Sequence, residues 1–179
     1  FADEAYYKTL STTAANYDWN LYIKSVDKSY TPSAEETTAI SKLSSARTTL
    51  QNLQKAQIQF TVPSNTTILG VGADAKIIDG FFTINGGSSK DQGSNIIIRN
   101  LEFQAPQDLA PAYTNTVGKE EWNAKYKAIN VVTGKQLWID HCTFSDGAHP
   151  DSAEVLTLGG VTKVVQRHDG LIDIEDSSD

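Results

Sequence analysis

Two carboxylates near the end of the sequence, Asp169 and Asp173, have the residue type and spacing to act together on a cation. On a straight strand they would share a face but lie about 13 Å apart, at a rise of ~3.3 Å per residue, which is too far for one ion. To share an ion, the chain must turn at Asp169-Gly170, and glycine permits such a turn. The alternative is that Asp169 is only a turn residue and Asp173 a solvated side chain.

The composition indicates a folded chain with an excess of acidic groups. Of 179 residues, 39% are hydrophobic and 21% are charged, and the formal net charge is −7. Such a chain can form one sizeable core. Nucleic acids and anionic membranes are bound through clustered Lys and Arg, so neither is an expected partner. No apolar run approaches the ~20 residues that span a bilayer. The single cysteine, Cys142, excludes an intrachain disulfide.

Residues 1–58 have the composition and spacing of helices. Ser33 and Glu36 form a capping box after Pro32, which predicts the start of a helix. Four apolar residues then recur at helical spacing as far as Lys55: Ile40, Leu43, Leu50 and Leu53. Aromatic residues precede this helix: Tyr6, Tyr7, Tyr17, Trp19 and Tyr22. We interpret them as packing groups, with carbohydrate stacking as the alternative.

From residue 59 onward, short β-branched runs separated by small polar residues predict many short strands. Three runs share a form in which two apolar residues stand three positions apart: Ile68-Leu69-Gly70-Val71, Ile98-Arg99-Asn100-Leu101 and Ile139-Asp140-His141-Cys142. The alternation of a strand therefore slips by one, which requires a bend at Gly70, Asn100 and His141. The runs lie 30 and then 41 residues apart. This variable period predicts the coils of a parallel β-helix with loops of different length.

We therefore expect an all-β fold, a right-handed parallel β-helix or solenoid. Residues 59–179 would form part of this β-helix domain. Residues 1–58 would form a helical N-terminal segment that packs on it. A β-sandwich is the main structural alternative, and it would require hairpin turns between neighbouring strands.

The last strand-like run repeats an earlier one. Moving residues 127–136 forward by 43 positions superimposes three pairs: Ile129 on Ile172, Asn130 on Asp173 and Val131 on Ile174. The next strand of that coil would begin at residue 180, so we expect the C-terminal coils to be missing from this chain. An uncapped solenoid end presents unpaired N–H and C=O groups. Because such an edge is a template for strand addition, we expect a homo-oligomer.

Two motifs give the sequence a family resemblance. Trp138-Ile139-Asp140-His141, followed at this separation by Asp169-Gly170-Leu171-Ile172-Asp173, resembles the pectate lyase family of secreted polysaccharide lyases. The resemblance extends from about Ser64 onward. It implies a right-handed parallel β-helix and cleavage of α-1,4-polygalacturonate by β-elimination. It also implies that Ca²⁺ bridges protein carboxylates and the substrate's uronate, where its charge stabilises the developing enolate.

The resemblance also assigns site residues. Asp169 and Asp173 match the family's metal ligands. The third metal-binding carboxylate falls at Lys127, where an ammonium repels Ca²⁺ and can pair with an aspartate of the adjacent coil, ~4.8 Å away. One interpretation is a weakened or inactive calcium site, which we prefer because both other carboxylates remain. The other is that Lys127 binds the substrate carboxylate directly.

The proton-abstracting arginine of the family comes from coils beyond this motif, so we expect the catalytic residue beyond residue 179. We interpret Arg167 and Lys163 as solvated or substrate-rim charges. His141 is interpreted as a bend residue that satisfies backbone groups rather than as a general base. The leading hypothesis is a truncated, secreted pectate lyase that is weak or inactive alone. The alternative is a noncatalytic polyuronate-binding or self-assembling solenoid.

Overall fold

The computed structural model describes residues 15–85, 93–116 and 118–175 of the 179-residue chain. The chain divides into two compact units. Unit 1 consists of Phe1–Gln57, Asp108–Lys125 and Asp151–Arg167. Unit 2 consists of Ile58–Gln107, Tyr126–Pro150 and His168–Asp179. The packing of residues 1–58 on the solenoid stays a prediction.

Two helices open the described part of unit 1, α2 (Trp19–Val26) and α3 (Ala34–Ile58, whose last residue belongs to unit 2). The capping box at the start of α3 is confirmed. Ser33 Oγ accepts a hydrogen bond from the Glu36 N–H (3.2 Å), and Glu36 Oε2 accepts one from the Ser33 N–H (3.0 Å). The helix continues past Lys55, its expected end. No helix in the described residues is both long and apolar enough to cross a membrane.

The predicted apolar face of α3 is confirmed, because Leu43 and Leu50 are 4% and 0% exposed and pack in one cluster with Tyr17. The described aromatic residues are packing groups, as expected. Their rings contact one another and the ring of Trp122: Tyr17 lies against Tyr22, Trp19 against Tyr22 and Trp122, and Tyr22 against Trp122. Tyr6 and Tyr7 lie outside the described residues.

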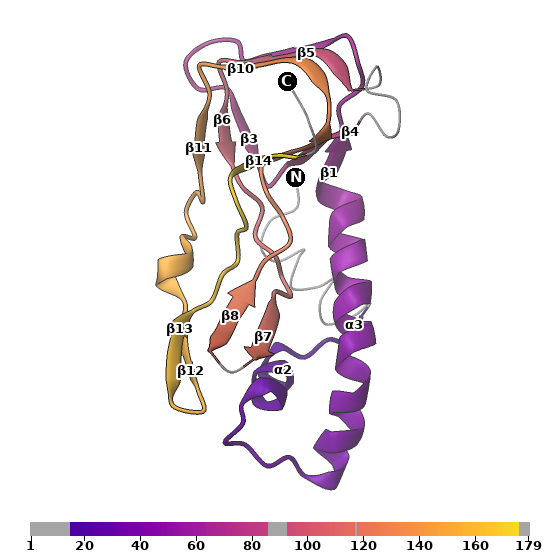
Figure 1. The fold of residues 1–179 in the computed structure, drawn as a ribbon, viewed down its shortest axis with the longest axis vertical. Coiled ribbons are helices and arrows are strands. Elements are labelled where there is room, and N and C mark those ends of the chain that lie inside the picture. The colour runs from indigo at the N-terminus through magenta and orange to yellow at the C-terminus, as the bar shows by residue number, and fades with distance from the viewer. Residues whose placement is uncertain (1–14, 86–92, 117, 176–179) are drawn as a thin grey trace. The chain divides into compact units, whose positions relative to one another are not determined.

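Unit 1 also contains two antiparallel hairpins, which were not predicted from the sequence (Figure 1). β7 (Ala112–Thr116) pairs with β8 (Lys119–Asn123). After the short 3₁₀ helix η1 (Asp151–Ala153), β12 (Val155–Leu158) pairs with β13 (Val161–Val164). Two glycines with positive φ connect β12 to β13, Gly159 at 54° and Gly160 at 82°. Positive φ at both central residues is what a tight hairpin turn requires.

Arg167 is not the solvated or rim charge expected from the sequence. Its guanidinium donates two hydrogen bonds to the Glu154 carboxylate (2.8 and 3.0 Å) and one to the Asp108 carbonyl (3.2 Å). It also lies 4.4 Å over the ring of Trp19. These partners come from segments distant in the sequence, so no local pattern reveals them. Lys163 is exposed on β13, as expected of a solvated charge.

Unit 2 is a parallel β-helix, which confirms the predicted fold class (Figure 1). Its strands, in chain order, are β1 (Gln59–Thr61), β2 (Thr66–Leu69), β3 (Lys76–Ile78), β4 (Phe81–Asn85), β5 (Ser94–Arg99), β6 (Glu102–Gln104), β9 (Ile129–Thr133), β10 (Lys135–Asp140), β11 (Thr143–Ser145) and β14 (Ile172–Ile174). They form the parallel sheets β1-β4-β9-β14, β2-β5-β10 and β3-β6-β11. Each complete coil thus contributes one strand to every sheet.

The predicted repeats stack in register. Ile98 pairs with Ile68 on one side and with Ile139 on the other. The offset of 43 residues is confirmed as well, because Ile172 pairs with Ile129. Stacking in this register gathers the inward apolar residues of successive coils into one buried core, which includes Ile84, Ile96, Ile98, Phe103, Ile129 and Val131.

The predicted bends are present, but Gly70, Asn100 and His141 contribute to them in different ways. Asn100 and His141 have positive φ values of 58° and 52°. Asn100 Nδ2 donates to the Gly70 carbonyl at 2.8 Å. A Cβ at Gly70 would lie 1.8 Å from the Asn100 carbonyl oxygen, so this position needs glycine because of a close backbone approach. The His141 ring contacts the side chain of Asp140, whereas a contact with backbone groups was expected.

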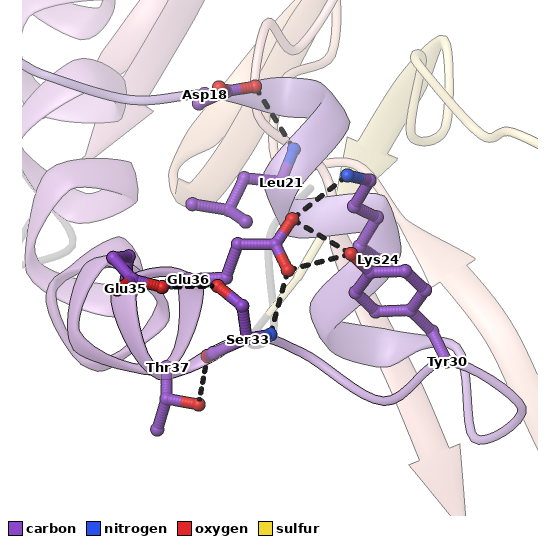
Figure 2. Close-up of polar contacts among 8 residues, drawn as sticks. All are labelled: Asp18, Leu21, Lys24, Tyr30, Ser33, Glu35, Glu36 and Thr37. Atoms are coloured by element: carbon purple, nitrogen blue, oxygen red, sulfur yellow. Dashed lines mark hydrogen bonds and ion pairs between the residues drawn. The ribbon is translucent and has the colours of Figure 1, made fainter.

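Glu36 gives this part of the fold a predictable pH dependence (Figure 2). Hydrogen bonds from the Ser33 N–H, the Tyr30 hydroxyl and the Lys24 ammonium lower the pKa of Glu36 from 4.5 to about 2. The charged carboxylate therefore stabilises the fold fully above pH 4.5, and this contribution is lost as the pH falls through the folded-state pKa. We expect Glu36→Gln to lower the thermal unfolding midpoint at pH 7, with a deficit that shrinks below pH ~4.5.

The matched control is Glu121→Gln, which removes one exposed glutamate from β8. It should leave the unfolding midpoint of the chain nearly unchanged across the same range. A deficit for Glu36→Gln that stays constant down to pH ~2 would contradict the role of the ionised carboxylate.

Candidate functional site

The chain turns between Asp169 and Asp173, as a shared cation would require. β14 begins only at Ile172, after a bend at Leu171, so Asp169 precedes the strand that carries Asp173. A Cβ added at Gly170 would lie 2.7 Å from Asp173 Oδ1. The Asp173 carboxylate therefore folds back over the turn, and a side chain at position 170 would displace it.

Lys127 reaches the two aspartates from the preceding coil. It stands immediately before Ala128, whose N–H donates to the Leu171 carbonyl (3.1 Å), and the Asp169 N–H donates to the Tyr126 carbonyl (3.1 Å). Parallel pairing of β14 with β9 continues this alignment. Backbone hydrogen bonds on both sides of Lys127 thus fix the offset between the two coils.

The side chains of Lys127, Asp169 and Asp173 form one group, here called the charge cluster. Lys127 Nζ lies 2.6 Å from Asp169 Oδ2 and 3.1 Å from Asp173 Oδ2. The expected pairing across the coils is confirmed, and it involves both carboxylates. The Lys127 side chain is 13% exposed, whereas those of Asp169 and Asp173 are 36% and 39% exposed. Most of the lysine side chain is covered, while the carboxylates keep more surface open to solvent.

Lys127 carries its proton in this arrangement. Burial acts to lower its pKa, but the hydrogen bonds to Asp169 and Asp173 and their negative charges outweigh burial and raise the pKa above its ordinary value of 10.5. A protonated amine has three N–H donors and no lone pair. Lys127 therefore acts neither as a metal ligand nor as a general base while it is paired.

The charge cluster does not fit a resident calcium ion as it stands. Ca²⁺ takes roughly six to eight oxygen ligands at ~2.3–2.6 Å. Here the ammonium already occupies one oxygen of each carboxylate. The assignment of Asp169 and Asp173 as metal ligands therefore stays a prediction.

A polar column beside Asp173 was not singled out from the sequence. Asp173 pairs in register with Asn130, and Asn130 pairs with Thr83. Ile129 and Val131 are fully buried, so the alternation of β9 directs Asn130 away from the core. Asn130 Oδ1 is buried and has no hydrogen-bond partner among the described residues. The offset of 43 residues predicted the pairing of Asn130 with Asp173, but it gave Asn130 no role and did not include Thr83.

Arg99 and His141, two other basic side chains of unit 2, lie at the ends of strands of a different sheet or directly after them. Arg99, the only arginine of this unit, forms an ion pair with Asp140 at 2.8 Å, and these residues end β5 and β10. His141 also contacts Asp140. β5 and β10 belong to the sheet β2-β5-β10, whereas Asp173 lies in β1-β4-β9-β14. Neither Arg99 nor His141 is therefore part of the charge cluster.

Comparisons with known proteins identify the family. A family model described as pectate lyase matches residues 19–179. The chain belongs to the pectate lyase family. It is 39% identical over 158 residues to a pectate lyase of Bacillus subtilis (strain 168). This match covers 88% of this chain and 34% of that protein. It is 43% identical over 127 residues to pectate lyase A of Dickeya chrysanthemi. This match covers 70% of this chain and 30% of that protein.

A solved pectate lyase bound to a hexasaccharide has a TM-score of 0.72 to this chain at 37% sequence identity. The match covers 90% of this chain and 38% of that one. The resemblance found in the motifs is thus confirmed at the level of sequence and of fold. This member of the pectate lyase family spans about a third of the length of the curated relatives described above.

Replacing Lys127 with methionine tests what the charge cluster contributes to stability. Lys127→Met keeps an unbranched side chain but leaves two carboxylates without their shared donor, so they repel each other. We expect a loss of about 1–2 kcal/mol in the free energy of unfolding, because the pairs are charge-assisted but partly exposed. Urea denaturation at pH 7 in a buffer with chelator measures it.

Lys163→Met is the matched control, because Lys163 is exposed on β13. It should change the free energy of unfolding by less than about 0.5 kcal/mol. Equal losses in the two variants would show that pairing in the charge cluster adds nothing specific.

Proposed function

We propose that this chain carries part of the substrate-binding surface of a polygalacturonate lyase. The observation that carries the proposal is the meeting of Lys127, Asp169 and Asp173 beside the sheet β1-β4-β9-β14, in a member of the pectate lyase family. A solved relative is described as bound to a hexasaccharide. The ligand that we assign to this chain is a polymer of α-1,4-linked galacturonate.

The reaction class that we propose for the protein is β-elimination. The proton that is removed lies beside a uronate carboxylate, and it becomes acidic enough only when positive charge stabilises the developing enolate. Lys127 supplies the positive charge of the charge cluster. Two of its three N–H groups can remain on Asp169 and Asp173 while the third binds a uronate carboxylate. We therefore propose Lys127 as a substrate-binding residue.

Calcium is the cofactor that the family generally uses. Asp169 and Asp173 would be the residues that hold it, since two of the three carboxylates implied by the resemblance are present. Lys127 at the third position repels a cation and is already bound to both remaining carboxylates. We propose that this pairing opposes calcium binding here.

The proposed reaction needs a proton acceptor that the charge cluster does not supply. Lys127 is protonated, and Arg99 is paired with Asp140 on another sheet. The family resemblance implies an arginine beyond residue 179. We therefore propose that the 179-residue chain binds polygalacturonate but cleaves it weakly or not at all.

The decisive measurement is a lyase assay on the 179-residue chain. Polygalacturonate with added Ca²⁺ should give little or no increase in the absorbance of the unsaturated product. Titration calorimetry with oligogalacturonate on the same preparation should detect binding, and Lys127→Met should weaken it. Robust turnover by this chain would show that a residue within it acts as the base.

A noncatalytic polyuronate-binding protein is the alternative function. An assay of the intact gene product distinguishes the two functions. A secreted lyase would form unsaturated product, whereas a binding protein would retain the polymer uncut. Binding with no product from the intact protein, with and without chelator, would favour the alternative.

A further inference from the structure

The charge cluster has the net charge of a calcium-loaded site without holding calcium. Asp169, Asp173 and the protonated Lys127 together carry one negative charge. The arrangement that the family resemblance implies, three carboxylates around one Ca²⁺, also carries one negative charge. Exchanging a carboxylate and a divalent ion for one ammonium therefore leaves the charge balance of the group unchanged.

We infer that the Lys127 ammonium takes the place of the metal ion, so that the charge cluster of this chain is complete without calcium and does not bind it. Lys127 Nζ donates a hydrogen bond to Asp169 Oδ2 at 2.6 Å and forms an ion pair with Asp173 Oδ2 at 3.1 Å. A calcium ion bound by both aspartates would compete with the ammonium for these carboxylates. It would also lie close to the Lys127 ammonium, which Coulomb repulsion disfavours.

The ion pairs of Lys127 also affect how two coils of the β-helix are held together. Lys127 precedes β9 and both aspartates lie in the segment that enters and forms β14, so the ion pairs join consecutive coils. A metal ion in that role can be removed by a chelator. A lysine side chain cannot, because it is covalently part of the chain. Cohesion between these coils is therefore independent of the calcium concentration.

One consequence concerns the ligand, and this part rests on the proposed function. Without a metal bridge, a uronate carboxylate meets the third N–H of Lys127 directly. Chelator should then leave the affinity for oligogalacturonate unchanged. In a site bridged by calcium, chelator would abolish binding.

Calcium titration of the wild-type chain and of Lys127→Asp tests the inference. In wild type, calorimetry should detect no calcium site that depends on Asp173, and the thermal unfolding midpoint should be the same in CaCl₂ and in EDTA. Lys127→Asp creates three carboxylates, so it should bind calcium at least roughly tenfold more tightly than wild type and unfold at a higher temperature in CaCl₂ than in EDTA.

Lys163→Asp is the matched control, because it makes the same change of charge at an exposed position of β13. It should gain no calcium site. If Lys127→Asp folds only when calcium is present, that result supports the inference. If it folds in neither buffer, comparison of wild type with Asp173→Asn decides, because calcium binding by wild type that Asp173→Asn removes overturns the inference.

Oligogalacturonate binding is measured separately, so that the two proposals can fail separately. Loss of wild-type binding in EDTA would overturn the inference about Lys127. Absence of binding in both CaCl₂ and EDTA would overturn the proposed function, while the calcium titrations would still decide the inference.

Discussion

Backbone hydrogen bonds between β9 and β14 hold Lys127 against the carboxylates of the next coil. In this register Ile172 pairs with the buried Ile129, and Asp173 pairs with Asn130. A slip of one residue would turn every side chain of β14 to the opposite face of the sheet, and Asp173 would then point away from Lys127. The position of the charge cluster is therefore a consequence of strand register in unit 2.

Much of unit 2 could be predicted because a solenoid turns local repetition into spatial contact. A residue and its equivalent one coil later become backbone neighbours, so an offset read from the sequence is also a strand pairing. Asn130 and Asp173 show this directly, since their separation of 43 residues is their register in the sheet. The bends follow in the same way, because Asn100 adopts the positive φ that few residues other than glycine and asparagine tolerate.

The rest of the structure could not be predicted, because it depends on contacts between segments whose proximity no sequence pattern indicates. Arg167 has a local context typical of a surface charge, yet Glu154, Asp108 and Trp19 enclose it. Short turn motifs are equally ambiguous. Gly159-Gly160 closes an antiparallel hairpin, whereas Asp79-Gly80, with Asp79 at a φ of 57°, joins strands of two different parallel sheets. Dipeptide chemistry permits the turn, but tertiary packing decides where the chain goes next.

Holding two coils together and activating a substrate make different demands on a cation. One ammonium satisfies Asp169 and Asp173, and its covalent attachment means that no ion has to be taken from solution. It supplies only one positive charge, however, and a single N–H remains for a third partner. A divalent ion offers twice the charge and several further coordination positions to an anionic ligand. The lysine therefore secures the coil and leaves less positive charge for a developing enolate, so groups outside the charge cluster must supply the rest of that stabilisation in any lyase built on this site.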